Sequence, residues 1–513
     1  MTFARLAAAV RVPIGRLVDR LVDPARRERG MLTVLSVYTL VWALYGLLSR
    51  SSQDAHFDMV ETVGWARDLA LGYPKHPPFA AYVAGLWFAV FPAADWSFYL
   101  LAVLVAALTL WIAWRIAGDY LDAEKRVVAL ALLTFVPFFN FHALKFNVNT
   151  VLMPVWAATA WFFLRSYETR RPVWAALAGV FAALALLGKY WSIFLILGLG
   201  LAALLDRRRA DYFRSPAPWV TVLAGLIVIG PHVAWLLAND FAPFSYAYVV
   251  HGTQSVFGAT MTAFGYVGGS LGYVALPLVL AWVMFQPRPA ALADVVMPAE
   301  DKSRLVLMAF ALPILLPAVF GPFGGVRLTS LWTMPAWALF PVVLLLPPSI
   351  RVTREAAVRI TAVAVILPLV MLFAAPLISV AIHRKGVRPS AEAHARLLAA
   401  EVARLWRATT DRPLRLIGGD QDLAYGAAFY LTDRPSVFPG LNMREAPWVD
   451  EARIARDGIA IVCMKRIAEC VQAAEQRATK GPAGQRAEVE LTRSHFGIAG
   501  KPERYVIVTV PPR

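Results

Sequence analysis

The sequence predicts a polytopic α-helical membrane protein of about 11 spans that ends in a small soluble α/β domain. Of its 513 residues, 59% are hydrophobic and only 16% are charged, which is too apolar for an ordinary soluble protein. Apolar runs long enough, or nearly so, to cross roughly 30 Å of hydrocarbon recur as far as residue 383. Beyond that residue the pattern changes to short strands and amphipathic helices.

The basic side chains predict how the chain is oriented in the membrane. The net charge is +16, but Lys and Arg gather in short patches between apolar blocks, which favours orientation by the positive-inside rule over nucleic-acid binding. Residues 1–30 contain many Arg and are expected to form a cytoplasmic amphipathic segment, not a cleaved signal. The loops expected in the cytoplasm are 26–30, 124–126, 165–171, 206–209, 286–304 and 351–359.

Residues 31–383 are expected to form the transmembrane domain. The predicted spans are 31–49, 97–117, 126–143, 150–166, 173–188, 190–205, 218–237, 262–285, 305–321, 328–347 and 359–383. Segment 79–92 is also apolar, but it is short and bounded by prolines, and the basic loops stay on one side only if it does not cross. The opposite side then receives a first loop (residues 50–96) and the regions 144–149, 188–191, 238–261 and 322–327.

Residues 384–513 are expected on that opposite, periplasmic side, because an odd number of spans separates the two termini. Short buried strands are predicted at 413–419, 426–433, 458–464 and 505–510, and amphipathic helices at 391–409 and 464–478. Alternating strands and helices predict a small α/β domain. Its two cysteines, Cys463 and Cys470, either form a disulfide in an oxidising periplasm or remain two free buried thiols, and the sequence leaves both open.

The first loop concentrates charge between two apolar blocks. Asp58 and Glu61 are three residues apart, so they share one face of the helix expected there, which should stop at Gly72. Three prolines between residues 74 and 78 then fix an extended segment that presents Lys75 and His76. A solvated loop between two spans is the alternative interpretation of this stretch.

Further polar side chains are expected on the same side of the membrane: Lys145, Asn147 and Asn149; Lys189 and Tyr190; His232, Asp240 and His251; and Arg327, five residues before Trp332. Ionisable groups at span ends are often only snorkelling anchors. We expect that role for Lys145, Asp240 and His251. Lys189 differs, since it lies at the apex of an otherwise uncharged apolar hairpin on the side where positive charge is depleted.

The order Asp58, Trp65-Ala66, Gly72-Tyr73 and His76-Pro77-Pro78 resembles the first extracytoplasmic loop of bacterial glycosyltransferases of the GT-C superfamily. The resemblance is to the protein-mannosyltransferase-like group (glycosyltransferase family 39), which is related to the lipid A aminoarabinose transferases and uses polyprenyl-phosphate sugars. KFNVNTVLMPVW, GKYWSIF and RLTSLWTMPAW resemble later segments of the family in the same order, so the likeness covers roughly residues 30–345. GAAFYLTDRP in the tail resembles the extra domain of some members.

The resemblance implies an inverting glycosyltransferase of the bacterial inner membrane. Its donor would be a polyprenyl-phosphate sugar, and its acceptor a periplasmic cell-envelope glycan, lipopolysaccharide, lipid or protein. The residues implied are Asp58 or, as second choice, Glu61 as catalytic carboxylate; Lys75, His76, Lys189 and Arg327 at the donor phosphate; and Asn147, Asn149, Tyr190 and Trp332 in the substrate site. Some relatives bind a divalent metal through a carboxylate where this chain has Asn149, and because an amide is a poor substitute we expect no metal or other cofactor.

Two other classes of protein fit part of the pattern. A transporter or lipid flippase also needs many spans, but its ionisable residues lie in mid-span, whereas these gather at one face. A structural assembly protein, whose soluble domain binds a partner, needs one span as an anchor rather than about eleven.

The orientation is testable with reporter fusions. A phosphatase that requires the oxidising periplasm should be active when it is fused at Arg513 and inactive when it is fused at Arg209, because the positive-inside rule places these sites on opposite sides. The reverse pattern of activity in cells would overturn the whole orientation.

Overall fold

The computed structural model describes residues 3–252, 255–386, 391–479 and 484–513, and the chain forms two compact units. The helical unit comprises Met1–Trp42, Ala102–Leu144 and Val148–Met371. The sheet unit comprises Ala43–Leu101, Lys145–Asn147 and Leu372–Arg513. The first loop and the C-terminal domain therefore belong to one compact unit, although about 290 residues separate them in sequence.

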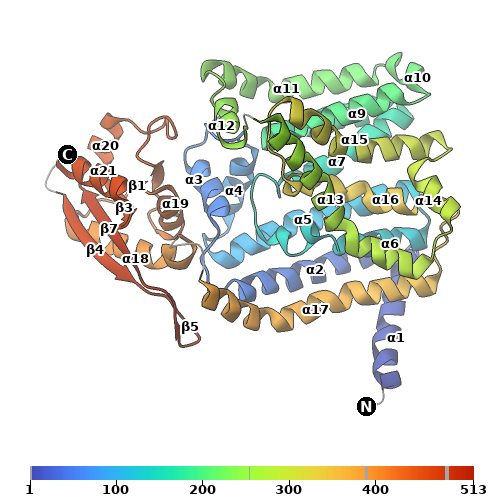
Figure 1. The fold of residues 1–513 in the computed structure, drawn as a ribbon, viewed down its shortest axis with the longest axis horizontal. Coiled ribbons are helices and arrows are strands. Elements are labelled where there is room, and N and C mark those ends of the chain that lie inside the picture. The colour runs from blue at the N-terminus through green and yellow to red at the C-terminus, as the bar shows by residue number, and fades with distance from the viewer. Residues whose placement is uncertain (1–2, 253–254, 387–390, 480–483) are drawn as a thin grey trace. The chain divides into compact units, whose positions relative to one another are not determined.

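The long helices of the chain lie mainly in the helical unit (Figure 1). The α-helices that lie wholly or partly in this unit are α1 (Phe3–Val22), α2 (Arg27–Ser49), α5 (Asp95–Tyr120), α6 (Ala123–Thr134), α7 (Leu152–Thr169), α8 (Pro172–Gly188), α9 (Ile193–Leu205), α10 (Arg209–Phe213), α11 (Ala217–Ala238), α12 (Ala242–His251), α13 (Val256–Phe285), α14 (Pro289–Val296), α15 (Asp301–Phe323), α16 (Phe340–Leu345) and α17 (Arg354–Lys385). Of these, α2, α5 and α17 continue into the sheet unit.

Six helices of the described residues are long and apolar enough to cross a membrane, namely α2, α5, α11, α13, α15 and α17. Four shorter apolar stretches cover α4 (Phe79–Val90), α8, Tyr190–Leu205 and Ser330–Leu345. The predicted span 126–143 is interrupted, because α6 ends at Thr134 and only two short 3-10 turns follow, η1 (Pro137–Phe139) and η2 (His142–Leu144). Pro137 explains the break, since a proline cannot donate a helical hydrogen bond and it restricts the residue before it.

Small residues allow close packing between helices of this unit. A Cβ added to Gly179 of α8 would lie 2.1 Å from the carbonyl oxygen of Thr221 in α11, so no side chain fits there. The Thr221 hydroxyl donates to the carbonyl oxygen of Ala175 at 3.0 Å. Close backbone contact and interhelical hydrogen bonds of this kind are what hold helices together in lipid.

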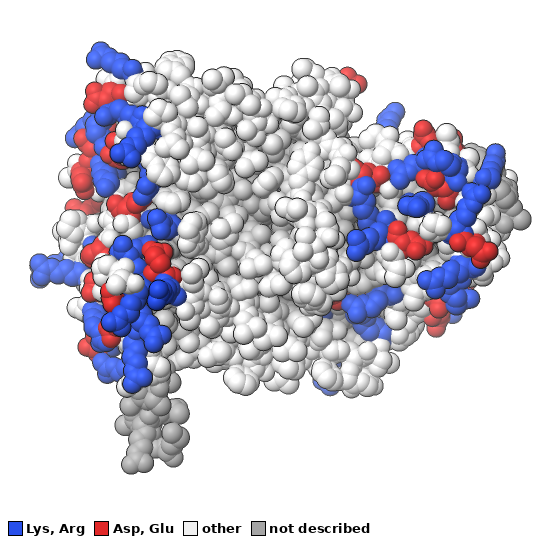
Figure 2. All heavy atoms as spheres, turned by 180° about the vertical axis from the view of Figure 1, so that it is seen from behind, with Lys and Arg blue, Asp and Glu red and all other residues white. Residues whose placement is uncertain are grey.

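The loops predicted to be cytoplasmic come together in the helical unit. Figure 2 shows charged side chains gathered along one edge of this unit, next to a broad surface without charges. Ion pairs join these loops to one another: Arg208 to Glu168 (3.0 Å), Arg207 to Asp301 (3.6 Å), Arg354 to Asp19 (2.7 Å) and Arg126 to Glu28 (3.7 Å). The basic loops therefore share one edge, as the charge pattern predicts, and the side of the membrane they face stays a prediction.

The sheet unit contains a five-stranded mixed sheet in the order β2-β1-β3-β7-β4. Its strands are β1 (Leu416–Gly419), β2 (Ser436–Pro439), β3 (Ile459–Met464), β4 (Gln485–Leu491) and β7 (Glu503–Val510), and a separate hairpin pairs β5 (Ser494–His495) with β6 (Ile498–Ala499). β1 runs parallel to β2 and β3, whereas β7 runs antiparallel to β3 and β4. The helices are α3 (Phe57–Arg67), α4, α18 (Ala391–Thr409), α19 (Gln421–Tyr430), α20 (Glu451–Asp457) and α21 (Ala468–Thr479).

One predicted strand is wrong, because most of residues 426–433 lie in helix α19. The Asp420 carboxylate caps this helix by accepting a hydrogen bond from the Leu423 backbone N–H at 3.2 Å. Residues 423–429 are all buried, so no polar face marks the helical period in the sequence. Strands β2 and β4 were not predicted.

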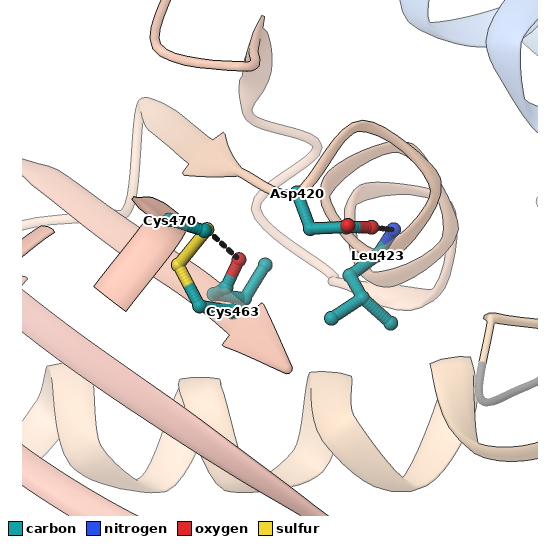
Figure 3. The surroundings of a disulfide bond; sticks show 5 residues. Asp420, Leu423, Cys463 and Cys470 are labelled. Atoms are coloured by element: carbon teal, nitrogen blue, oxygen red, sulfur yellow. Dashed lines mark hydrogen bonds between the residues drawn. A yellow bond between two sulfur atoms is a disulfide. The ribbon is translucent and has the colours of Figure 1, made fainter. Parts of the chain in front are cut away.

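The structure decides between the two alternatives for the cysteines. Cys463 at the end of β3 and Cys470 in α21 form a disulfide across seven residues of sequence (Figure 3). The bond joins the helix to the central strand of the sheet, so it holds one face of the domain in place.

The first loop forms two helices in the sheet unit. Helix α3 ends at Arg67, earlier than predicted, because Asp68 leaves the helix and accepts hydrogen bonds from Ser436 Oγ at 2.9 Å and from Arg453 at 3.1 Å. At about 1.5 Å per residue, the 12 residues of α4 extend about 18 Å, which is short of the roughly 30 Å that a span needs.

Helix α19 packs directly on α3. A Cβ on Gly64 would lie 2.3 Å from Cε1 of Tyr425, whose side chain is buried. The Arg67 guanidinium donates to the backbone carbonyl oxygens of Pro435 at 2.7 Å and Ala428 at 2.9 Å. The C-terminal domain thus fixes the helix that carries Asp58 and Glu61.

Gly64→Ala should weaken this contact. The added methyl group overpacks against a buried ring, which costs about 1 to 3 kcal/mol, so the melting temperature of the purified full chain should fall. Gly200→Ala in α9 is the matched control, since nothing lies within 4 Å of the added Cβ there, and a helical alanine is at least as stable as glycine. Equal melting temperatures for the Gly64→Ala and parental proteins would show that the contact does not hold the loop.

Candidate active site

Asp58 lies in the first turn of α3 and meets side chains from the region 144–149. The His56 side chain caps this helix through Nδ1, which accepts a hydrogen bond from the Asp58 backbone N–H at 3.1 Å. The Asp58 carboxylate pairs with Lys145 Nζ at 2.7 Å and accepts a hydrogen bond from Asn147 Nδ2 at 3.2 Å. The predicted placement of Asp58 and Asn147 on the same side is consistent with this contact.

The surroundings of Asp58 favour its ionised form. Burial alone would raise the pKa of this carboxyl, but the Lys145 ammonium and the Asn147 hydrogen bond outweigh burial and lower the pKa below its ordinary value. The Asp58 side chain is still 37% exposed, so a second molecule has access to it. Lys145 was expected to be a snorkelling anchor; the structure instead shows it as the counter-ion of Asp58.

Glu61 lies one turn further along α3 and is buried, with 4% of its surface exposed. Lys75 Nζ donates to its two carboxylate oxygens at 2.8 and 3.0 Å, and Gln421 Nε2 donates at 3.3 Å. Burial raises the pKa of Glu61 to about 7, since it exceeds the opposing effect of Lys75, and the Asp58 charge raises it further. Two neighbouring carboxylates therefore differ in protonation because they differ in burial.

The proline-rich segment is closed on itself next to α3. The Tyr73 backbone N–H donates to the His76 carbonyl oxygen at 3.1 Å, and the Tyr73 ring stacks on Trp65 with 5.4 Å between centroids. The His76 ring meets Trp65 edge to face at 5.7 Å. The segment thus directs Lys75 toward Glu61 and packs His76 against the aromatic pair. We call Asp58, Glu61, Lys75, Lys145, Asn147 and Gln421 the carboxylate cluster.

A second group of predicted residues surrounds Trp332 in the helical unit. Lys189 Nζ donates to Asn149 Oδ1 at 2.9 Å and lies 4.8 Å from the centroid of the Trp332 ring. His251 meets the same ring edge to face at 4.9 Å. The Arg327 backbone N–H donates to the His251 carbonyl oxygen at 2.8 Å.

The residues Asn149, Lys189, His251, Arg327 and Trp332 form what we call the tryptophan cluster. Burial, followed by the nearby charges of Lys189 and Arg327, lowers the pKa of His251, which keeps its ring neutral. The cluster thus contains two cations, Lys189 and Arg327, and the His251 ring beside them adds no further positive charge. His251 was expected to be an anchor, and the structure shows it packed inside this group.

Tyr190 has a different set of partners. Its hydroxyl hydrogen-bonds His232 Nε2 at 2.9 Å, and its ring stacks on Phe244 with 4.6 Å between centroids. Tyr190 and His232, which were both selected from the sequence, are therefore hydrogen-bond partners.

The predicted residues therefore gather in the carboxylate cluster of the sheet unit and, in the helical unit, in the tryptophan cluster and the Tyr190–His232 pair. Lys75 belongs to the sheet unit, whereas Lys189 and Arg327 belong to the helical unit. The convergence of all three on one donor phosphate stays a prediction. Gln421 was missed by sequence analysis, since no motif marks a residue 360 positions after its partner.

The residues around Asn149, where some relatives are expected to hold a metal, do not fit a divalent cation. The oxygen of Asn149 already accepts a hydrogen bond from the Lys189 ammonium, a cation in its own right. Among the described residues, no three His, Cys, Asp or Glu side chains gather as metal ligands would. The predicted metal independence stays a prediction.

Comparison with known proteins identifies the fold. The family model of dolichyl-phosphate-mannose-protein mannosyltransferases matches residues 75–235. The crystal structure of ArnT from Cupriavidus metallidurans bound to undecaprenyl phosphate is similar over 93% of this chain and 98% of that chain, with 12% identity and a TM-score of 0.59. This chain has the fold of the GT-C superfamily.

The GT-C resemblance predicted from the motifs is thus confirmed, as is the fold class of a multi-pass membrane protein with a small C-terminal sheet domain. Apo ArnT from the same organism matches with 13% identity, 94% and 98% coverage and a TM-score of 0.48. The oligosaccharyltransferase AglB from Archaeoglobus fulgidus, in complex with an inhibitory peptide and a dolichol-phosphate, matches with 12% identity, 92% and 74% coverage and a TM-score of 0.41. No curated protein matches the sequence.

The raised pKa of Glu61 predicts how stability depends on pH. The folded chain binds this proton more tightly than the unfolded chain, so the stability of the parental protein relative to Glu61→Gln should fall as pH rises from 4.5 to about 7. The slope should reach up to about 1.4 kcal/mol per pH unit. Melting temperatures of the two proteins across this range measure it.

Glu488→Gln is the control for this measurement, because the hydrogen bond from Lys465 lowers the pKa of this surface carboxyl. The stability of the parental protein relative to this variant should fall as pH decreases, which is the opposite direction. A Glu61→Gln difference that is independent of pH would contradict the raised pKa.

Proposed function

We propose that this chain is an integral-membrane glycosyltransferase that moves a sugar from a polyprenyl-phosphate donor to an acceptor on the periplasmic face of the bacterial inner membrane. The observation that carries the proposal is Asp58, a partly exposed carboxylate that Lys145 and Asn147 keep ionised. The fold supports the same conclusion, because ArnT has this fold and was solved with undecaprenyl phosphate bound.

The proposed reaction needs a base and positive charge, and it needs no general acid. The acceptor oxygen forms a bond to the anomeric carbon while the bond from that carbon to the phosphate oxygen breaks. The phosphate ester leaves as a dianion, and Asp58 takes the proton of the acceptor. Attack from the face opposite the leaving phosphate inverts the anomeric centre, as it does in inverting sugar hydrolases.

The donor phosphate is proposed to bind Lys75 of the carboxylate cluster, Lys189 and Arg327 of the tryptophan cluster, and His76 beside Trp65. Charge-assisted hydrogen bonds from Lys75, His76, Lys189 and Arg327 would stabilise the charge that develops on the leaving group. Glu61 holds Lys75 at 2.8 Å, so it acts as a positioning residue for that cation and is the second candidate for the base. Asn147, Asn149, Tyr190 and Trp332 are proposed to contact the sugar or the acceptor.

The proposal is tested by incubating purified full-length protein with a radiolabelled polyprenyl-phosphate sugar and measuring the release of free polyprenyl phosphate. A glycosyltransferase releases it, whereas a transporter or flippase leaves the donor intact. Cell-envelope glycan, lipopolysaccharide, lipid and protein fractions supplied as acceptors then identify the acceptor class. A protein that binds the donor and never releases free polyprenyl phosphate with any of these acceptors would exclude this function.

Asp58→Asn should reduce turnover by about 10² to 10⁴, the usual contribution of a positioned acid or base. His56 caps this helix, and asparagine keeps the shape of the aspartate side chain, so folding and donor binding should persist. Asp411→Asn, at an exposed position of the sheet unit, is the matched control and should transfer at the parental rate. Parental turnover by Asp58→Asn would remove Asp58 from the mechanism, and loss in Glu61→Gln alone would transfer the role to Glu61.

Alanine variants of Lys75, Lys189 and Arg327 should each weaken donor use roughly tenfold to a hundredfold, because one charge-assisted contact to phosphate contributes about 1.5 to 3 kcal/mol. The readout is kcat/KM for the donor. Lys465→Ala is the control, since Lys465 pairs with Glu488 on the surface. A shared clamp is disproved if any of the three variants keeps the parental kcat/KM.

A further inference from the structure

The sheet unit contains a cavity of about 300 Å³ that the proposed reaction does not use. Its polar wall is formed by Ser52, His383, His394, Arg493, Lys501 and Glu503. Ser52 follows α2, His383 lies at the end of α17 and His394 lies in α18. Arg493 and Lys501 lie between β4 and β7, and Glu503 begins β7. A volume of this size accommodates a small ligand or the polar part of a larger one.

Hydrogen bonds hold the walls of this cavity in place. His383 Nε2 donates to the Ile498 carbonyl oxygen at 2.9 Å, and His394 Nδ1 hydrogen-bonds the Tyr505 hydroxyl at 2.8 Å. The Arg493 guanidinium donates to the carboxylate of Asp54, whose side chain is fully buried. The cavity is therefore a fixed feature of the fold.

The charges around the cavity leave one cation without a counter-ion. Asp54 balances Arg493, and Glu503 lies 3.6 Å from Arg466. Lys501 is exposed, and in the described ranges no carboxylate lies within ion-pair distance of it. A lysine ammonium at the rim of a polar cavity attracts an anion, and phosphate is the common biological anion that lysine binds as a point charge.

The position of the cavity along the chain favours a ligand at the membrane surface. His383 lies in the last turn of α17, and Ser52 follows α2 by three residues. Both helices are candidate spans. Side chains at the ends of spans lie at the depth of lipid headgroups.

We propose that this cavity binds a phosphate group, carried by a lipid headgroup or present as free phosphate, and that Lys501 supplies the charge that recognises it. The site is separate from the proposed donor site, since neither the carboxylate cluster nor the tryptophan cluster contributes to its walls. Lys501 recognises the phosphate from the exposed rim of the cavity, where a headgroup can enter from the bilayer surface.

The test is a calorimetric titration of the detergent-solubilised full chain with dihexanoyl phosphatidic acid, with inorganic phosphate and with dihexanoyl phosphatidylcholine. Phosphatidic acid should bind, and phosphatidylcholine should bind at least tenfold more weakly, because its own ammonium neutralises the phosphate. Lys501→Gln should raise the Kd for phosphatidic acid about tenfold or more. Lys501→Arg keeps the charge and should stay within about threefold of the parental value.

Two controls locate the site. Lys465→Gln removes an equal charge from the surface of the same unit, and Lys75→Ala alters the proposed donor site; both should leave the Kd for phosphatidic acid unchanged. Binding of inorganic phosphate with the same affinity and the same dependence on Lys501 would assign the site to the soluble anion. An unchanged Kd in Lys501→Gln, or loss of binding in Lys75→Ala instead, would overturn the proposal. The readout is binding, so the result does not depend on sugar transfer.

Discussion

The contact between Lys145 and Asp58 is the interaction on which the proposed chemistry depends. A carboxylate in a partly apolar loop binds a proton more readily than one in water, and the adjacent Lys145 ammonium at 2.7 Å is the largest of the contacts that reverse that tendency. Glu61, one turn away, also has a lysine partner, yet its deeper burial raises the pKa to about 7. A lysine next to a carboxylate therefore gives an ionised side chain at Asp58 and, at Glu61, a side chain whose pKa is about 7.

The C-terminal domain is part of the structure that presents these carboxylates. Gln421 donates to Glu61, and Tyr425 fills the space that the missing side chain of Gly64 leaves. Tyr430 donates to the Asp95 carboxylate at 2.6 Å, at the far end of the first loop. A loop held at several points loses less freedom when substrate binds, so this domain preorganises the site.

Local patterns allowed much of the fold to be predicted. The amphipathic period of residues 391–409 predicts a helix, and α18 has those bounds. The order of the motifs predicted the superfamily, and charge spacing predicted which loops share an edge. The helix at 421–430 was missed because it is apolar on every side, and the roles of Lys145 and Gln421 were missed because both come from contacts between distant segments. Such contacts leave no signal in the neighbouring sequence.

A carboxylate that activates the acceptor implies a single displacement, and the anomeric configuration of the product tests this most directly. The anomeric configurations of the donor and of the purified product are compared by NMR, from the coupling constants measured at the anomeric position. A base-assisted attack opposite the leaving phosphate predicts that the two configurations are opposite. A product that keeps the configuration of the donor would instead require a covalent glycosyl intermediate, and would contradict the role proposed for Asp58.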